Sequence, residues 1–278
     1  MSRLLKDIGT LEWCRRTNGV LSAPERLRYT AAGVLETVRS LPRLLLFRLG
    51  WTGGGPDPSA FAPPDTTLAR RVVEASMHLD PMFVQHGYRS YLFARALGAR
   101  DGLACDGEAL FAAAMLHDYA FPNIDTTDDR CFTLAGAEIA AEVLSECGLS
   151  PALQHDVLDA ITLHFNPRVP REQGVLQHLL HDGVFIDVLG ARAWHLDPLG
   201  YQRVVERHPR HGFIHRATPG LRAHARRVPC SRADQALRCG FNMAQRLGPG
   251  YAHEARTRQP PALTHPPGQG DARQQTQS

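Results

Sequence analysis

The feature that most constrains the fold is the run at residues 110–116, where Leu, Phe, three Ala, Met and Leu follow one another without a polar residue. A helix that is apolar on every side must be buried. Asp106 is placed to cap such a helix at its N-terminus, and the run ends in His117 and Asp118. The sequence therefore predicts a core helix with a His-Asp pair at its end.

Consecutive residues of a helix point about 100° apart, so His117 and Asp118 project as a fork. An imidazole beside a carboxylate is a suitable half-site for Zn, Fe or Mn. The dipeptide alone is not specific, because the chain has two others, at residues 155–156 and 181–182. A polar helix end is the alternative interpretation, and the buried setting of the first copy is what favours a metal site.

Length and composition limit the class of protein. The 278 residues allow one sizeable domain or two small ones. The net charge of +3 is too small to argue for nucleic acid. The six cysteines show no C-x-x-C spacing, which argues against a zinc ribbon or a disulfide framework. We find no leader-like N-terminus and no apolar run of about 18 residues, so the expectations are a cytoplasmic location and no membrane span.

The chain divides by composition into four parts. Residues 1–51 are expected to form an N-terminal helical extension, and residues 52–64 a linker rich in Gly and Pro. Residues 65–247 form the main domain, and residues 248–278, rich in Pro, Gln and Gly, a disordered tail. The absence of a strand pattern, an internal repeat and a glycine-rich phosphate loop predicts an all-α fold.

Helix starts follow from capping residues. Ser22, with Pro24 and Glu25 behind it, predicts one start, and Asp65 a second that leads a helix to about residue 77. Further helices are expected at residues 81–97, which carry His86, at 134–147, from Ser150 to about residue 164, and at 174–190, with Ser231 capping the last one.

Asp187 is singled out by its place on the 174–190 helix. It extends the apolar row of Leu176, Leu180 and Val184. A carboxylate in such a row is unfavourable unless something pairs with it, which makes Asp187 the candidate fourth metal ligand. Asp182 points to another side of the helix and is expected to be solvated.

Two segments keep open alternatives. Residues 41–51 are apolar apart from Arg43 and Arg48, and they cover the core or lie on a membrane surface or another subunit. Residues 203–227 are dense in Arg and His. They form a solvated basic face or an anion-attracting rim near the site.

His86, the pair His117-Asp118 and Asp187, each on its own helix, resemble the HD superfamily of metal-dependent hydrolases over residues 68–190. The resemblance implies that these four residues hold one divalent metal ion (Zn, Fe or Mn) in an HD-domain helical bundle. Water or substrate would take the remaining positions.

Three stretches of the sequence, around His86, at residues 129–140 and at residues 185–190, are similar to those of one branch of this superfamily. That branch contains cyanamide hydratase and many uncharacterised bacterial HD proteins. Branches with two metals carry a further His where this chain has Phe132, so the resemblance implies a single metal and no di-iron oxygenase chemistry. His164 matches a His of this branch, which would orient substrate or water or have a structural role. His164 and Asp118 are the candidate catalytic residues.

Several functions remain open from the sequence. The favoured one is a phosphohydrolase-type hydrolase that acts on a small molecule through a metal-activated water. The alternatives are a cyanamide hydratase-like hydro-lyase acting on a nitrile, and a non-catalytic HD module that binds a nucleotide or a partner. Asp125, Asp128 and Asp129 are candidates for a general acid or base. Neither the oligomeric state nor the substrate follows from the sequence.

Overall fold

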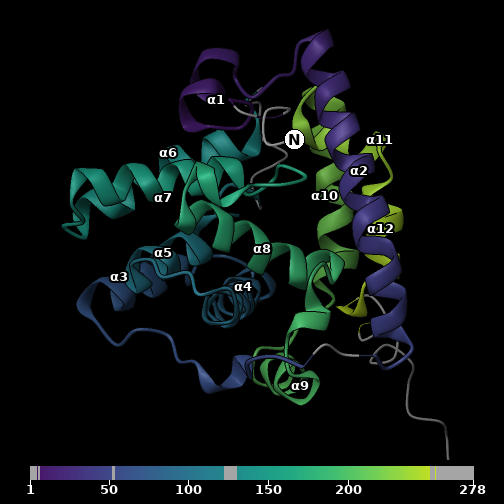
Figure 1. The fold of residues 1–278 in the computed structure, drawn as a ribbon. Coiled ribbons are helices and arrows are strands. Elements are labelled where there is room, and N and C mark those ends of the chain that lie inside the picture. The colour runs from purple at the N-terminus through teal and green to yellow at the C-terminus, as the bar shows by residue number, and fades with distance from the viewer. Residues whose placement is uncertain (1–4, 6, 52–53, 122–129, 251–253, 255–278) are drawn as a thin grey trace, which may run out of the picture.

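The computed structural model of the chain describes residue 5 and residues 7–51, 54–121, 130–250 and 254. These residues form twelve α-helices and three short 3-10 helices (Figure 1). Within these ranges there is no β-strand, only an isolated bridge between Val20 and Ser231. The prediction of an all-α fold is confirmed.

The N-terminal half contains α1 (Leu11–Thr17), α2 (Ala23–Arg48), η1 (Pro58–Ala60), α3 (Thr67–Ser76), α4 (Pro81–Asp101), α5 (Gly107–Leu116) and α6 (Phe132–Glu146). The C-terminal half contains α7 (Pro151–Leu163), η3 (Arg171–Gln173), α8 (Val175–Leu189), η4 (Ala193–His195), α9 (Pro198–Arg207), α10 (Phe213–Arg227), α11 (Arg232–Arg238) and α12 (Phe241–Leu247).

The centre of the domain is α4, which Figure 1 shows nearly end-on below α8. It packs along α8 and against α5, and α7 contacts both of these helices. Two glycines permit the close crossings. A Cβ on Gly87 would lie 2.9 Å from the carbonyl oxygen of Ala114 in α5, and one on Gly183 of α8 would lie 2.2 Å from that of Ser90. Side chains at these positions would push apart the helices that carry the candidate ligands.

Most of the predicted helix starts are found. Ser22 and Glu25 form a capping box at α2, and the side chains of Asp106, Ser150 and Ser231 accept backbone hydrogen bonds at their helix starts. Two details differ. Thr66, one residue later than expected, caps α3. Ser231, expected to cap the last helix, caps α11, which is followed by α12.

The N-terminal helices share the core of the domain. Leu11, Trp13 and Tyr29 belong to the same continuous hydrophobic cluster as the helices of residues 65–247. In Figure 1, α2 runs as one long helix beside α10, α11 and α12. Of residues 41–51, Leu44 is buried, whereas Leu49 and Trp51 are 78% and 71% exposed. Part of this segment therefore covers the core, and part faces outward.

Of the predicted tail, the structure describes residues 248–250 and 254. Glu254 is buried, and its carboxylate lies 3.7 Å from the guanidinium of Arg210. The rest of the predicted tail, and therefore its predicted disorder, lies outside the described residues. Across the described part of the chain, no helix combines the length and apolar content needed to cross a membrane.

Candidate metal centre

Three of the predicted ligands meet in one place. His86 lies on α4, and His117 and Asp118 lie directly after the last residue of α5. One ligand atom from each of these residues lies within 4.8 Å of the other two. Both histidines are buried, with 1% of their surface exposed. The sequence placed His86 on one helix and the His117-Asp118 pair on another, and the close crossing of α4 and α5 at Gly87 brings them together.

Hydrogen bonds fix the orientation of both imidazole rings. Nδ1 of His117 lies 2.8 Å from the carbonyl oxygen of Ala114, and Nδ1 of His86 lies 2.6 Å from Oδ2 of Asp187. Carbonyl and carboxylate oxygens only accept hydrogen bonds, so Nδ1 carries the proton in each ring. In the neutral form of each ring the lone pair is therefore on Nε2, on the side of the ring that faces Asp118.

The distances around Asp118 suit a metal ion. Nε2 of His117 lies 3.4 Å from Oδ2 of Asp118, and Nε2 of His86 lies 3.8 Å from it. Two ligands about 2.1 Å from one tetrahedral ion are separated by roughly 3.4 Å. Both Nε2 atoms are buried and have no hydrogen-bond partner. Buried polar atoms are normally paired, so a cation between these three side chains would satisfy them.

Charge also favours a cation here. Burial alone would raise the pKa of Asp118, but His117 and His86 outweigh it and lower this pKa. Burial opposes a positive charge on His117, yet the Asp118 carboxylate outweighs that effect and raises the pKa of His117. Asp118 is therefore ionised at neutral pH, and with only 13% of its side chain exposed it needs a positive partner.

Asp187 is fully buried, but the structure places it behind His86. Its Oδ1 accepts hydrogen bonds from Arg89 Nε (2.9 Å) and Arg210 (2.5 Å), and its Oδ2 accepts one from Arg89 (2.8 Å) besides the one from His86. Burial would raise the pKa of Asp187, but Arg210 and Arg89 hold it well below its usual value. Asp187 therefore orients His86 and lies apart from the three ligand atoms around Asp118.

Asp187 is a buried, paired carboxylate, as its place in the apolar row predicts. Its partners are Arg89, for which the sequence predicted no role, and Arg210, which the sequence placed in a basic segment without linking it to Asp187. A usable clue was the spacing of His86 and Arg89, which lie three residues apart on one face of α4. Asp182, by contrast, is hydrogen-bonded to Arg192 at 2.5 Å, away from the site.

The Arg- and His-rich segment at residues 203–227 is not uniform. Arg203 and Arg216 form exposed ion pairs with Asp57 and Asp80. Arg210, in contrast, is 2% exposed, and His224 is fully buried. For Arg210 neither predicted role holds, because its guanidinium group is bonded to Asp187 inside the protein.

His164 lies beside the three candidate ligands, directly after α7. Its Nδ1 lies 2.6 Å from the carbonyl oxygen of Ile161, and its Nε2 lies 3.9 Å from Oδ1 of Asp118. Burial, reinforced by the charge of His117, lowers the pKa of His164 to about 3. The ring is therefore neutral at physiological pH, and Nε2 presents a lone pair toward Asp118.

We expect His164→Ala to leave the metal bound and to lower turnover by about 100-fold, because substrate or water would lose an orienting group while His86, His117 and Asp118 stay in place. Metal content measured by mass spectrometry, together with turnover of a substrate found by screening, checks this. Loss of the metal in this variant would instead make His164 a fourth ligand.

Phe132, at the start of α6, lies among aromatic side chains beside the site. Its ring packs against Phe121 and Phe165, with centroids 5.3 Å away in each case, and against His164 at 6.2 Å. No second group of three or more possible ligands occurs among the described residues. Asp125, Asp128 and Asp129 lie outside those residues.

A small cavity of about 40 Å³ opens onto His86, Asp118 and His164. Among the described residues, its wall contains no arginine or lysine and consists mainly of aromatic and aliphatic side chains. Besides the three site residues, the lining is Phe121, Phe132, Phe165, Val184, Phe185, Val188, Phe213, Ala217, Thr218, Leu221, Phe241 and Gln245. A volume of this size holds a few water molecules or one small reacting group.

No protein-family model matches the sequence, and no curated protein is significantly similar to it. The case for a metal centre therefore rests on the geometry of His86, His117 and Asp118 and on the sequence pattern that predicted them.

Proposed function

We propose that this protein is a metal-dependent hydrolase or hydratase of the HD type that adds water to a small molecule. The observation that carries the proposal is the pair of unpartnered, buried Nε2 atoms of His86 and His117, which face the ionised Asp118. Two buried Nε2 atoms without a hydrogen-bond partner are unfavourable by themselves, and a divalent cation held by these atoms and by Asp118 would satisfy them.

His86, His117 and Asp118 would hold the ion, and their nitrogen and oxygen atoms suit Zn, Fe or Mn. A bound divalent ion lowers the pKa of a water molecule toward neutrality and polarises a substrate group. Asp187 and the Ala114 carbonyl keep both histidines in the tautomer with a free Nε2. His164, 3.9 Å from Asp118, is placed to orient water or substrate.

Within this class, the lining of the cavity favours an uncharged substrate. Phosphate esters are usually bound by arginine or lysine, and none lines the cavity among the described residues. The nearby Arg89 and Arg210 are already bonded to Asp187. This supports hydration of a nitrile-like group over the phosphohydrolase activity that the sequence favoured.

The test is metal analysis of the purified protein, followed by activity screens. We expect about one divalent ion per chain, and turnover of small nitriles in preference to phosphate esters and nucleotides. Protein that binds no metal after incubation with Zn²⁺, Mn²⁺ or Fe²⁺ would contradict the proposal. Binding of a nucleotide without any turnover would favour a non-catalytic module, and two ions with oxygen consumption would favour an oxygenase.

A further inference from the structure

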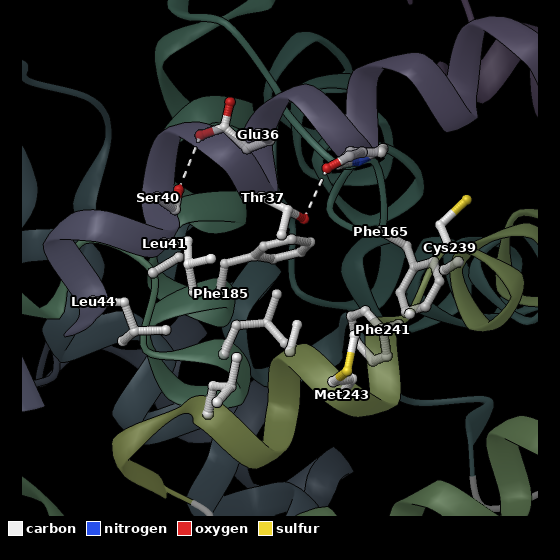
Figure 2. Close-up of a pocket in the computed structure, with 18 of the residues that line it drawn as sticks. Glu36, Thr37, Ser40, Leu41, Leu44, Phe165, Phe185, Cys239, Phe241 and Met243 are labelled. Atoms are coloured by element: carbon white, nitrogen blue, oxygen red, sulfur yellow. Dashed lines mark hydrogen bonds between the residues drawn. The ribbon is translucent and has the colours of Figure 1, made fainter.

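A second, larger cavity of about 220 Å³ lies between α2, α8, α11 and α12. Figure 2 shows α2 on one side of it and α12 on the other, with the ring of Phe185 between them. We call it the apolar chamber. Its lining is Tyr29, Gly33, Glu36, Thr37, Ser40, Leu41, Leu44, Phe165, Pro167, Phe185, Leu189, Ala191, Ala236, Cys239, Gly240, Phe241, Met243, Ala244 and Leu247.

The few polar groups of the chamber are already used within the protein. The hydroxyl of Thr37 donates to the carbonyl oxygen of Gly33 (2.9 Å), and that of Ser40 lies 3.4 Å from the carboxylate of Glu36 (Figure 2). The hydroxyl of Tyr29 donates to the carbonyl oxygen of Phe165 (2.7 Å). Among the described residues that line the chamber, Glu36 is the one that carries a charge. The remaining surface is apolar and suits an uncharged, apolar group.

The apolar chamber adjoins the metal site. Phe165, Phe185 and Phe241 line both the chamber and the small cavity over His86, Asp118 and His164. Phe165 directly follows His164 in the chain, and its ring lies 5.6 Å from that of Phe241. The two spaces therefore adjoin, and these three aromatic side chains lie at their junction.

We propose that the apolar chamber binds the hydrocarbon part of an uncharged substrate whose reacting group lies at the metal site. The part of this proposal that concerns the metal site rests on the proposed function. An apolar cavity of roughly 150 Å³ is enough to bind benzene, so the chamber accommodates a single ring or a short alkyl chain. The small cavity then needs to admit only the reacting group, which agrees with its volume of about 40 Å³.

Gly33 offers a direct way to fill the chamber. It lies on α2, and a Cβ there would have only Pro167 near it, at 3.8 Å, so a side chain fits without a backbone clash. Gly33→Phe places a ring in the space proposed for the substrate. Val34→Phe is the matched control, because Val34 is the next residue of α2 and is 51% exposed.

The probe is 4-fluorotoluene, which is uncharged and has one ring, and its binding is followed by ¹⁹F NMR. We expect saturable binding to the full chain and to Val34→Phe, and binding weakened roughly tenfold or more in Gly33→Phe because the space is filled. Unchanged thermal melting and metal content show that Gly33→Phe is folded. Equal binding by the two variants, or no binding to the unmodified chain, would overturn the proposal.

Metal exchange tests the link between the two cavities. The ¹⁹F signal of the bound probe should broaden in protein loaded with paramagnetic Mn²⁺ and stay sharp in protein loaded with Zn²⁺. Binding without this broadening would place the probe away from the site and overturn the proposed link. Protein that binds the probe but no metal would instead overturn the proposed function, with the chamber still a ligand site.

Discussion

Replacing His117 or Asp118 by alanine should abolish metal binding and activity while leaving the fold nearly intact. Each variant removes one of the three proposed ligands, a larger loss than the roughly 10–100-fold weakening typical when a partner of a ligand is removed. Both residues follow the last residue of α5, which ends at Leu116. His117→Ala also loses the hydrogen bond to Ala114, worth about 1 kcal/mol. Metal content, circular dichroism and turnover measure the three expectations.

A second His-Asp dipeptide provides the matched control. His155 and Asp156 lie on α7 and are exposed. Alanine at either position should leave metal content and turnover unchanged, because neither side chain belongs to the group of candidate ligands. Retention of a stoichiometric ion by His117→Ala and by Asp118→Ala would place the metal elsewhere and contradict the site.

The helices were predictable because their determinants are local. A helix start depends on residues that lie within about four positions of one another, as in the pair Ser22 and Glu25 at α2 and in Asp106 at α5. The burial of residues 109–116 in α5 follows from their all-apolar composition, so His117 and Asp118, which come next, lie at a buried helix end. This setting distinguishes the pair from the exposed His155 and Asp156 on α7.

The partners of Asp187 were not predictable in this way. The spacing of apolar residues predicts that Asp187 is buried and needs a positive neighbour, but it does not identify that neighbour. Arg89 is 98 residues away in the chain, and Arg210 reaches Asp187 from the connection before α10. The packing of α2 over α8 and α12, which forms the apolar chamber, is likewise set by contacts distant in sequence.

The second large effect is expected at Asp187, where Asp187→Asn should destabilise the protein and weaken metal binding. The substitution removes the negative charge between the fully buried Arg89 and the nearly buried Arg210. Breaking a buried ion pair from one side costs about 3–5 kcal/mol of unfolding free energy. It also removes the carboxylate that orients His86, which should weaken metal affinity about 10–100-fold. Urea unfolding and metal titration measure the two effects.

Asp182→Asn is the control on the same helix. Asp182 pairs with Arg192, and their side chains keep 11% and 22% of their surface exposed. We expect a smaller loss there than at Asp187, because both side chains keep contact with solvent and Arg192 keeps its ion pair with Asp101, with no change in metal affinity. Similar losses at the two positions would show that Asp187 has no special role.

The pH dependence of the Asp187 effect has a definite sign. The pKa of Asp187 is lower in the folded protein than its usual value, and the pKa of an aspartate in an unfolded chain is about 3.9. As the pH falls, the unfolded chain takes up the proton first, so the stability that Asp187 provides is complete at neutral pH and declines below about 3.9. The difference in unfolding free energy between the unmodified protein and Asp187→Asn should therefore be largest near neutral pH and smaller near about pH 3. A difference that grows on acidification would mean that Asp187 is protonated in the folded protein, and its ion pairs with Arg89 and Arg210 would then not exist.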